Sequence, residues 1–451
     1  MIVAASTVAT PQFDWNALGP IVALAAGMVV ALIVGLFPGN GGKFLAMLTG
    51  AAGAIVAIVL SILHWNEPVA TQVIADSLVI DRAALAGTII ASASALVGLS
   101  IAGRAAGTED AGHGETSALI LGSTLGMAIL VSANDLVTVF LGLELLSIPL
   151  YVLCASYVDR TASLESGLKY LILGSVGSGT ALMGIALIYG ATGSMSIPEI
   201  GATGGNGELQ GLIYPGIALL LAGFGFKLSL APLHQWTPDV YDGAPTSITA
   251  FMSVATKTAA LIVTARLLIV AFGTEAQYDL WHPILLVLAA ASIVVGNVGA
   301  LGQPSMKRLM GYSSVAQAGY LVAALAVGNI GAMLAYLTAY AVSTLAVFAV
   351  VAAREHERPD LGDDIAALDG LSQERPLLGW IATIGLFGLA GLPLTVGFFG
   401  KVVVAGALIS ASQTWLAVLM IVGSIISLAY YAPPVLRIWR KTPVPLPGAP
   451  R

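Results

Sequence analysis

Five ionisable side chains stand inside long apolar stretches of this 451-residue sequence: Glu144, Lys169, Lys227, Lys257 and Lys401. A charge near the middle of a bilayer costs about 2.5–3.5 kcal/mol, so residues of this kind usually mark a path for ions or protons. A buried lysine can lose several pKa units from about 10.4, which brings it into the range of proton exchange. Ammonium groups would also repel a sodium ion along such a path. The pattern therefore predicts proton transfer within a membrane.

Lys227 lies in AGFGFKLSLAPLHQWTPDVYDGAPT, residues 222–246, the segment around which the chain is organised. Pro232 follows five residues later and removes a helix hydrogen bond, which predicts a broken helix with freed backbone groups. Broken membrane helices are typical of places where ions or protons move. His234 comes just after the proline and is either a proton relay or an interfacial hydrogen-bonding residue.

Glu144, in FLGLELLSIPLYVL, is the acid that lies deepest in an apolar stretch. It is either a proton-accepting group or half of a structural ion pair that fixes helix packing. Because it is the only deep acid available to a deep lysine, we expect it to form an ion pair with Lys227. Opening that pair would free the Lys227 proton.

The other three lysines differ in depth. Lys169, in SLESGLKYLILGS, lies close to a helix end and can instead extend its ammonium to the lipid headgroups. Lys257, in SVATKTAA, falls near the centre of its helix, and we expect it to relay protons between two half-channels. Lys401 ends LAGLPLTVGFFGK, beyond Pro393, and we expect it to release protons on the outer side.

Polar side chains recur at helical spacing on two later helices. Each stripe falls on one face of its helix, because positions three or four apart are neighbours. Together they can line a water-filled path from Lys257 to Lys401, although any one of them can simply hold two helices together by a hydrogen bond. They are Ser313, Ser314, Gln317 and Tyr320, then Tyr336, Tyr340, Ser343 and Thr344.

Composition sets the class of protein. The chain is 57% hydrophobic and 9% charged, far from the roughly 25% charged residues of soluble domains, and its mean hydropathy is +0.92. It is therefore predicted to be an all-α polytopic membrane protein. Its one cysteine, Cys154, excludes an internal disulfide or a multi-cysteine iron–sulfur site, so we expect no redox centre and no metal in this chain. The net charge of −6 indicates no nucleic-acid partner, and the N-terminus does not resemble a cleaved signal peptide.

Windows of about 20 apolar residues predict thirteen membrane helices, near 17–37, 44–63, 83–103, 116–133, 135–157, 163–190, 211–236, 245–271, 281–301, 306–327, 330–353, 376–409 and 413–436. The seventh and twelfth contain Pro232 and Pro393 and lie five helices apart. Helices 4–8 and 9–13 are therefore predicted to be two inverted five-helix repeats. The corresponding parts are an N-terminal segment (1–115), a first repeat (116–272), a second repeat (273–440) and a tail (441–451).

Positive charges predict the orientation, because Lys and Arg concentrate in cytoplasmic loops. With the N-terminus outside and the C-terminus cytoplasmic, twelve of the eighteen Lys and Arg lie on the cytoplasmic side: Lys43, Arg104, Arg160, Lys307, Arg308, Arg354, Arg358, Arg375, Arg437, Arg440, Lys441 and Arg451. The longest cytoplasmic loop, 354–376, is either a solvated connector or a docking site for a partner.

Five of these segments, in this order and at these separations, resemble subunit N of the bacterial proton-pumping NADH-quinone oxidoreductase, respiratory complex I. They are FLGLELLSIPLYVL, SLESGLKYLILGS, KLSLAPLHQWTPDVYDGAPT, MKRLMGYSSVAQAGY and LAGLPLTVGFFGK. The resemblance covers roughly residues 80–440, and HQWTPDVYDGAPT and ELLSIPLYVL are its most specific parts. Bacterial members commonly have a fourteenth helix, for which this sequence has no further apolar window.

The resemblance implies two inverted repeats with broken helices 7 and 12, and proton translocation by Glu144, Lys169, Lys227, Lys257 and Lys401. It implies a subunit of an NADH:quinone oxidoreductase in the bacterial plasma membrane, with other membrane-arm subunits and the lipid bilayer as partners. FMN, iron–sulfur clusters and quinone are expected in those partner subunits and none in this chain. The alternatives are a subunit of a multi-subunit Na⁺/H⁺ antiporter or membrane-bound hydrogenase, and a structural spacer that pumps nothing.

Overall fold

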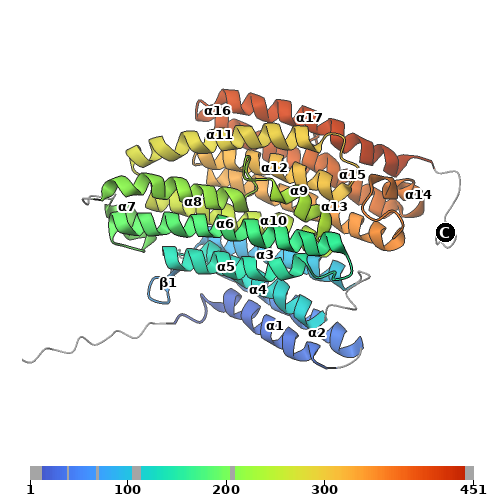
Figure 1. Ribbon diagram of the computed structural model, residues 1–451, viewed down its shortest axis with the longest axis horizontal. Helices are drawn as coiled ribbons and strands as arrows, with labels where there is room; N and C mark the ends of the chain where they lie inside the picture. The colour runs from blue at the N-terminus through green and yellow to red at the C-terminus, as the bar shows by residue number, and fades with distance from the viewer. Residues whose placement is uncertain (1–12, 38–39, 68–70, 104–112, 204–208, 442–451) are drawn as a thin grey trace, which may run out of the picture.

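The computed structural model describes residues 13–37, 40–67, 71–103, 113–203 and 209–441, which fold into a bundle of helices running in nearly the same direction (Figure 1). The expected all-α class is confirmed, with one small antiparallel hairpin, β1 (Thr71–Val73) and β2 (Leu78–Ile80), besides the helices. We call the two ends of the bundle the α7 end, on the left in Figure 1, and the α14 end, on the right.

The described residues form seventeen α-helices: α1 (Gly19–Gly35), α2 (Asn40–Leu63), α3 (Arg82–Ala102), α4 (His113–Ser132), α5 (Leu136–Cys154), α6 (Thr161–Thr192), α7 (Ile197–Thr203), α8 (Ile213–Lys227), α9 (Trp236–Gly243), α10 (Thr246–Arg266), α11 (Glu275–Ala300), α12 (Met306–Ala326), α13 (Ile330–Glu357), α14 (Leu371–Glu374), α15 (Pro376–Ala390), α16 (Val396–Ser410) and α17 (Thr414–Trp439). Four short helical turns complete them: η1 (His64–Asn66), η2 (Gln210–Leu212), the π-helical η3 (Leu267–Ala271) and η4 (Ile365–Leu368).

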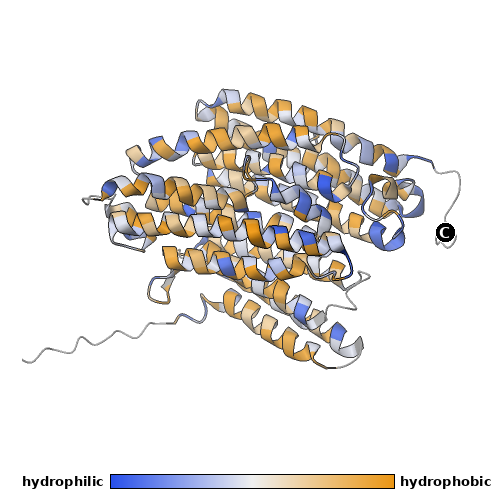
Figure 2. Ribbon diagram, in the orientation of Figure 1, coloured by the Kyte–Doolittle hydropathy of each residue, from blue (hydrophilic) through white to orange (hydrophobic). Residues whose placement is uncertain are grey.

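Ten helices of the described part are long and apolar enough to cross a membrane, and α1, α15 and α16 are shorter apolar helices. Apolar residues cover most of the helix surfaces, while hydrophilic ones gather near α14 (Figure 2). The fold is therefore that of a polytopic membrane protein. Residues 442–451 of the expected tail, as well as Arg104 and Arg451, lie outside the described residues.

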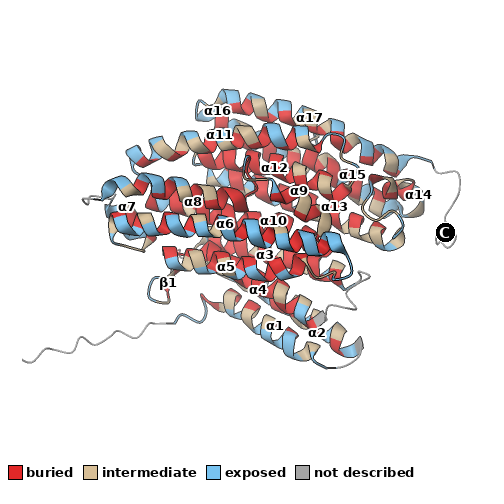
Figure 3. Cartoon of the chain, viewed as in Figure 1, coloured by how far each residue is buried: buried red, intermediate tan, exposed pale blue. Residues whose placement is uncertain are grey.

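Of the long apolar helices, α4, α10 and α12 are the most buried, and α10 and α12 pack together as a central pair. In α10 and α12, 83% and 94% of the most apolar window is buried, against 33% in α6, and Figure 3 shows exposed faces on α6, α16 and α17. Small residues allow close packing at the edge, where Gly27 of α1 meets Gly53 of α2 and a Cβ on either would overlap the other backbone. The central pair carries Lys257 and the polar stripe of residues 313–320, so the polar side chains are shielded from lipid.

Two apolar segments are each split into a pair of helices. The segment predicted over 211–236 forms α8 and the turn after it, but α9 begins only at its last residue, Trp236, and continues to Gly243. The segment predicted over 376–409 forms α15 and α16. The first break begins earlier than Pro232 suggested, because α8 ends at Lys227 and Ser229 adopts a left-handed conformation (φ 62°). At the second break Gly391 is left-handed (φ 81°), as glycine tolerates.

The connection between α13 and α15 is anchored to the bundle and is not the solvated connector that we expected as the simpler alternative. Arg354, with its side chain 1% exposed, pairs with Glu357 and Glu374, each at 2.8 Å. Its Nε donates to the Ala367 carbonyl at 2.8 Å. The same connection is tied to α17 by Arg437 and Asp369, 3.1 Å apart.

Replacing Arg354 with Met should destabilise the protein, because removing one partner of a buried ion pair costs about 3–5 kcal/mol. The expected result is a lower melting temperature in detergent and less assembled protein in the membrane. Arg375→Met is the matched control, since Arg375 also pairs with Glu357 but is 47% exposed. If both variants melt at the wild-type temperature, Arg354 does not anchor the connection.

Candidate functional site

Lys227 is the last residue of α8, rather than a residue in the middle of a helix. Its Nζ donates to the Tyr170 hydroxyl at 3.2 Å and lies 5.0 Å and 5.8 Å from the ring centroids of Tyr170 and Tyr151. The partial negative charge at a helix C-terminus favours an ammonium, and aromatic faces add to that attraction. A buried cation is therefore stabilised at the break without a carboxylate in contact.

The expected ion pair between Glu144 and Lys227 is not formed. Lys227 takes part in none of the ion pairs found among the described residues. Glu144 lies partly buried on α5, and its Oε1 is buried with no hydrogen-bond partner in the described part of the chain. It is close enough to act on Lys227 electrostatically, but an aromatic pair, Tyr151 and Tyr170, surrounds the ammonium instead.

Lys257 reaches from the middle of α10 to the first helix break. Its Nζ donates to the Leu228 carbonyl at 3.1 Å and to Ser229 Oγ at 2.9 Å, and the residue is 1% exposed. The carbonyls of a helix C-terminus have no partner within the helix and must be satisfied from outside. Lys257 therefore stabilises the break and at the same time places a titratable amine beside it.

Lys401 does the same at the second break. From the second turn of α16 its Nζ reaches back to the carbonyls of Leu389 and Ala390, at 3.0 and 2.9 Å, which close α15. A third bond joins it to Ser424 Oγ at 3.0 Å, and the Tyr320 ring centroid lies 4.9 Å away. The side chain passes over Gly391, where a Cβ would collide with it. At each helix break a lysine from another helix thus binds the freed carbonyls: Lys257 at the first and Lys401 at the second.

The polar stripe of α12 connects to this second break. Gln317 donates to the Leu389 carbonyl at 3.1 Å, the same oxygen that Lys401 binds, and accepts from the Tyr336 hydroxyl. Toward Lys257, Ser314 bonds the Tyr340 hydroxyl at 2.9 Å, and Tyr340 donates to the carbonyl of Ser253, one helical turn from Lys257.

The stripe is therefore both a set of interhelical bonds and a nearly continuous polar line, so both interpretations remain open. Ser313 bonds Tyr431 of α17, while Thr344 Oγ1 is buried with no partner among the described residues. The line meets Lys401 at the Leu389 carbonyl, which both Gln317 and Lys401 bind, but it stops short of Lys257.

Lys169 does not join the three buried lysines. Its side chain is 39% exposed, and it pairs with Glu165 at 2.7 Å and with Asp239 of α9 at 2.9 Å. Arg308 of α12 pairs with the same Asp239 at 2.9 Å. Lys169 is thus bound to two carboxylates near the start of α6, and the cluster lies nearer the α14 end than Lys227 does, because α9 follows the break toward that end.

His234 lies in the turn between α8 and α9, where it is partly buried. Its Nδ1 has no hydrogen-bond partner within the described residues, and neither has the hydroxyl of Thr237 one turn later. The structure thus keeps His234 at the break without joining it to a lysine.

Sequence reasoning missed several polar residues that hold the site. Lys307, predicted at the cytoplasmic start of the helix over 306–327, is 5% exposed and bonds the Ala244 carbonyl at 3.1 Å, with Glu355 at 3.7 Å. Tyr170, Ser229 and Ser424 bind the three lysines, and nothing in their spacing indicated it. Among the described residues no group of His, Cys, Asp and Glu could hold a metal ion.

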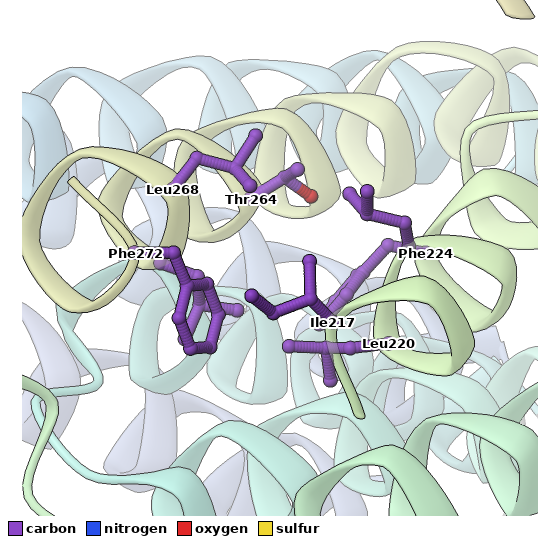
Figure 4. Close-up of a pocket in the computed structure, with 8 residues that line it drawn as sticks. Ile217, Leu220, Phe224, Thr264, Leu268 and Phe272 are labelled. Carbon is purple, nitrogen blue, oxygen red and sulfur yellow. The ribbon is translucent and has the colours of Figure 1, made fainter. Parts of the chain in front are cut away.

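An apolar cavity of about 10 Å³ separates the first break from the α7 end (Figure 4). Its walls come from α8, from the end of α10 and from η3: Ile217, Leu220, Leu221, Phe224, Thr264, Leu267, Leu268 and Phe272. The only polar group, the Thr264 hydroxyl, is bonded to the Ala260 carbonyl at 2.6 Å. A water needs about this much room and two or more polar partners, so the cavity is a dry barrier.

Comparisons with known proteins agree with this geometry. Residues 133–427 match the family described as NADH:quinone oxidoreductase/Mrp antiporter, TM. NADH-quinone oxidoreductase subunit N of Maricaulis maris is 37% identical over 431 residues, which cover 94% of this chain and 88% of the relative.

Solved structures share the fold. A chain in the structure of respiratory complex I from Thermus thermophilus with bound aureothin matches with a TM-score of 0.79 and 33% identity, covering 94% of this chain and 90% of that one. A chain of the Mrp complex from Dietzia sp. matches in fold, with a TM-score of 0.84 at 21% identity and coverage of 96% and 81%. The chain therefore belongs to the NADH:quinone oxidoreductase/Mrp antiporter family, and within it to the subunits N of NADH-quinone oxidoreductase.

Proposed function

We propose that this chain is a membrane-arm subunit of a bacterial NADH-quinone oxidoreductase that translocates protons, driven by electron transfer from NADH to quinone elsewhere in the complex. The observation that carries the proposal is the row of three buried lysines, Lys227, Lys257 and Lys401, placed at two helix breaks with no carboxylate paired to any of them among the described residues. Amines held by neutral oxygens can release a proton without leaving a buried carboxylate unpaired.

The proposed architecture is thirteen membrane spans, with α8/α9 and α15/α16 each crossing as one broken span. Helices α4–α10 and α11–α17 then form two inverted repeats, within residues 116–272 and 273–440, after an N-terminal segment over 1–115. Two features support the correspondence between the two repeats. Each repeat has its helix break in its fourth span, and at each break a lysine binds the carbonyls that end the first helix.

In the proposed orientation the α14 end is cytoplasmic and the α7 end is outside. Arg354 and Arg358 pair with Glu374 of α14, Arg375 follows α14 directly, and Arg437 and Arg440 bond Asp369 and Gln373 beside it. All five therefore lie at the α14 end, which fits the enrichment of positive charge in cytoplasmic loops. The N-terminus would then be outside and the C-terminus cytoplasmic, in the plasma membrane.

Protons would enter from the α14 end, pass Lys227 and Lys257, and follow the polar line of α12 and α13 to Lys401. Glu144 sets the charge state of Lys227 from a distance, His234 serves as a possible relay at the first break, and the Lys169 cluster lies on the entry side. The apolar lining of the cavity offers a proton no polar group between Lys227 and the α7 end except the Thr264 hydroxyl, which supports a lateral route.

The implied partners are other membrane-arm subunits and the bilayer, and FMN, iron–sulfur clusters and quinone would belong to partner subunits. A subunit of a multi-subunit Na⁺/H⁺ antiporter or membrane-bound hydrogenase is the alternative function. Purifying the complex through a tag on this chain separates them: NADH-oxidising subunits support the proposal, and a complex without them contradicts it.

Replacing Lys401 with Ala should lower the number of protons pumped per NADH more than it lowers assembly. The reason is that a positioned proton-transfer group contributes about 10²–10⁴ to the rate of its step. Pumping is measured with a pH-sensitive dye in inverted membrane vesicles, and assembly on native gels. Lys441→Ala, which removes the same charge from the exposed end of the chain, is the control. If a fully assembled Lys401→Ala complex pumps the normal number of protons per NADH, Lys401 is not a proton-transfer group.

Lys257→Arg tests the relay. Arginine preserves the charge but keeps its proton at every relevant pH, so pumping should fall while the bonds to the Leu228 carbonyl and Ser229 can still form. The measurement is the proton-to-NADH ratio in the same vesicles. If this variant pumps like the wild type, Lys257 is a fixed positive charge that caps the helix break, and protons move through water and hydroxyls.

A further inference from the structure

Two buried oxygens on α5 have no hydrogen-bond partner among the described residues: Glu144 Oε1 and the Tyr151 hydroxyl. Buried polar atoms are nearly always hydrogen-bonded, so two such exceptions on one helix call for an explanation. The residues are seven positions apart and therefore lie on the same face of α5. Ser147 stands between them; its hydroxyl hydrogen is donated to the Leu143 carbonyl, so toward Tyr151 it offers only its oxygen, as an acceptor.

Both oxygens belong to the surroundings of Lys227. The Lys227 ammonium lies 5.8 Å from the Tyr151 ring centroid, and the Tyr151 and Tyr170 rings meet edge to face with centroids 5.0 Å apart. The Glu144 carboxylate acts electrostatically on both Tyr151 and Lys227. A tyrosine side chain on a helix also points back toward the N-terminus, which brings the Tyr151 hydroxyl toward Glu144.

The neighbouring helix leaves room for this hydroxyl. Gly174 of α6 faces it so closely that a Cβ there would overlap the Tyr151 oxygen. Aromatic packing alone does not need that oxygen, since the ring already packs against Tyr170. The hydroxyl is therefore accommodated in a buried place where it satisfies no protein group.

We propose that the Tyr151 hydroxyl is the proton relay between Glu144 and Lys227, a role that rests on the proposed proton translocation. Tyr151 accepts a hydrogen from the protonated Glu144 carboxyl, directly or through one water, and gives its own hydrogen to the neutral Lys227 amine. One O–H bond of Glu144 breaks, one N–H bond of Lys227 forms, and Tyr151 ends with the same number of hydrogens. This relay replaces the direct ion pair that the structure lacks.

Two variants act on this hydroxyl in different ways. Tyr151→Phe removes the oxygen and keeps the ring, while Gly174→Ala keeps Tyr151 but presses a new Cβ on its hydroxyl and on the two ring carbons beside it. Each should lower NADH-driven pumping several-fold, because water can replace only part of what a positioned proton-transfer group contributes. Each should also raise the solvent deuterium isotope effect on pumping, since proton transfer becomes rate-limiting. A purely structural role for Tyr151 would not raise that isotope effect.

Gly299→Ala is the matched control, because its Cβ would press on the Tyr312 ring in the same way, at a place where we propose no proton transfer. Lys227→Ala tests the proposed function itself. If Lys227→Ala stops pumping while assembled Tyr151→Phe shows the wild-type rate and isotope effect, the relay is wrong and the proposed function stands. If Lys227→Ala pumps normally, the proposed function fails as well.

Discussion

Backbone carbonyls left without partners at two helix breaks are the constraint on which the rest of the structure depends. In a membrane no water is available to bind such groups, so an interrupted helix survives only where other parts of the protein satisfy it. Here Lys257 binds the freed carbonyl of Leu228, and Lys401 binds those of Leu389 and Ala390. The freed carbonyls thus need the lysine side chains, which a membrane interior would otherwise exclude. The lysines in turn need these carbonyls as hydrogen-bond acceptors.

The number of bonds at each lysine distinguishes their protonation chemistry. An ammonium has three hydrogens to donate, and a neutral amine has two. Lys401 donates to three oxygens, so losing a proton must break one of its bonds, whereas Lys257 donates to two and can become neutral with both intact. Lys227 has only one such partner, Tyr170. Deprotonation would therefore cost Lys401 one hydrogen bond and need cost Lys257 and Lys227 none.

The buried lysines and the two interruptions could be predicted from the sequence because each has a local signature, a charge or a proline within an apolar run. The partners that these side chains bind on other helices could not be predicted from the sequence. The prediction that Glu144 pairs with Lys227 assumed that the only deep acid must bind the deep lysine, but the carbonyl end of α8 and two aromatic rings take that place. Lys307 was predicted at the cytoplasmic start of its helix and Arg354 at the start of a polar loop, yet the structure buries both. Sequence spacing indicates the face of a helix, not its depth or its neighbours.

The dry cavity between α8 and α10 also shapes the electric field. Where water reaches into a membrane protein it screens the field, so the membrane potential falls mainly across the part that excludes water. In this chain that part includes the layer lined by Leu220, Phe224 and Leu268, between Lys227 and the α7 end. Moving a unit charge through 100 mV costs about 2.3 kcal/mol. In the proposed orientation, much of that electrical work would be concentrated in a few ångströms of aliphatic and aromatic side chains, and this layer would act as an electrical insulator beside Lys227.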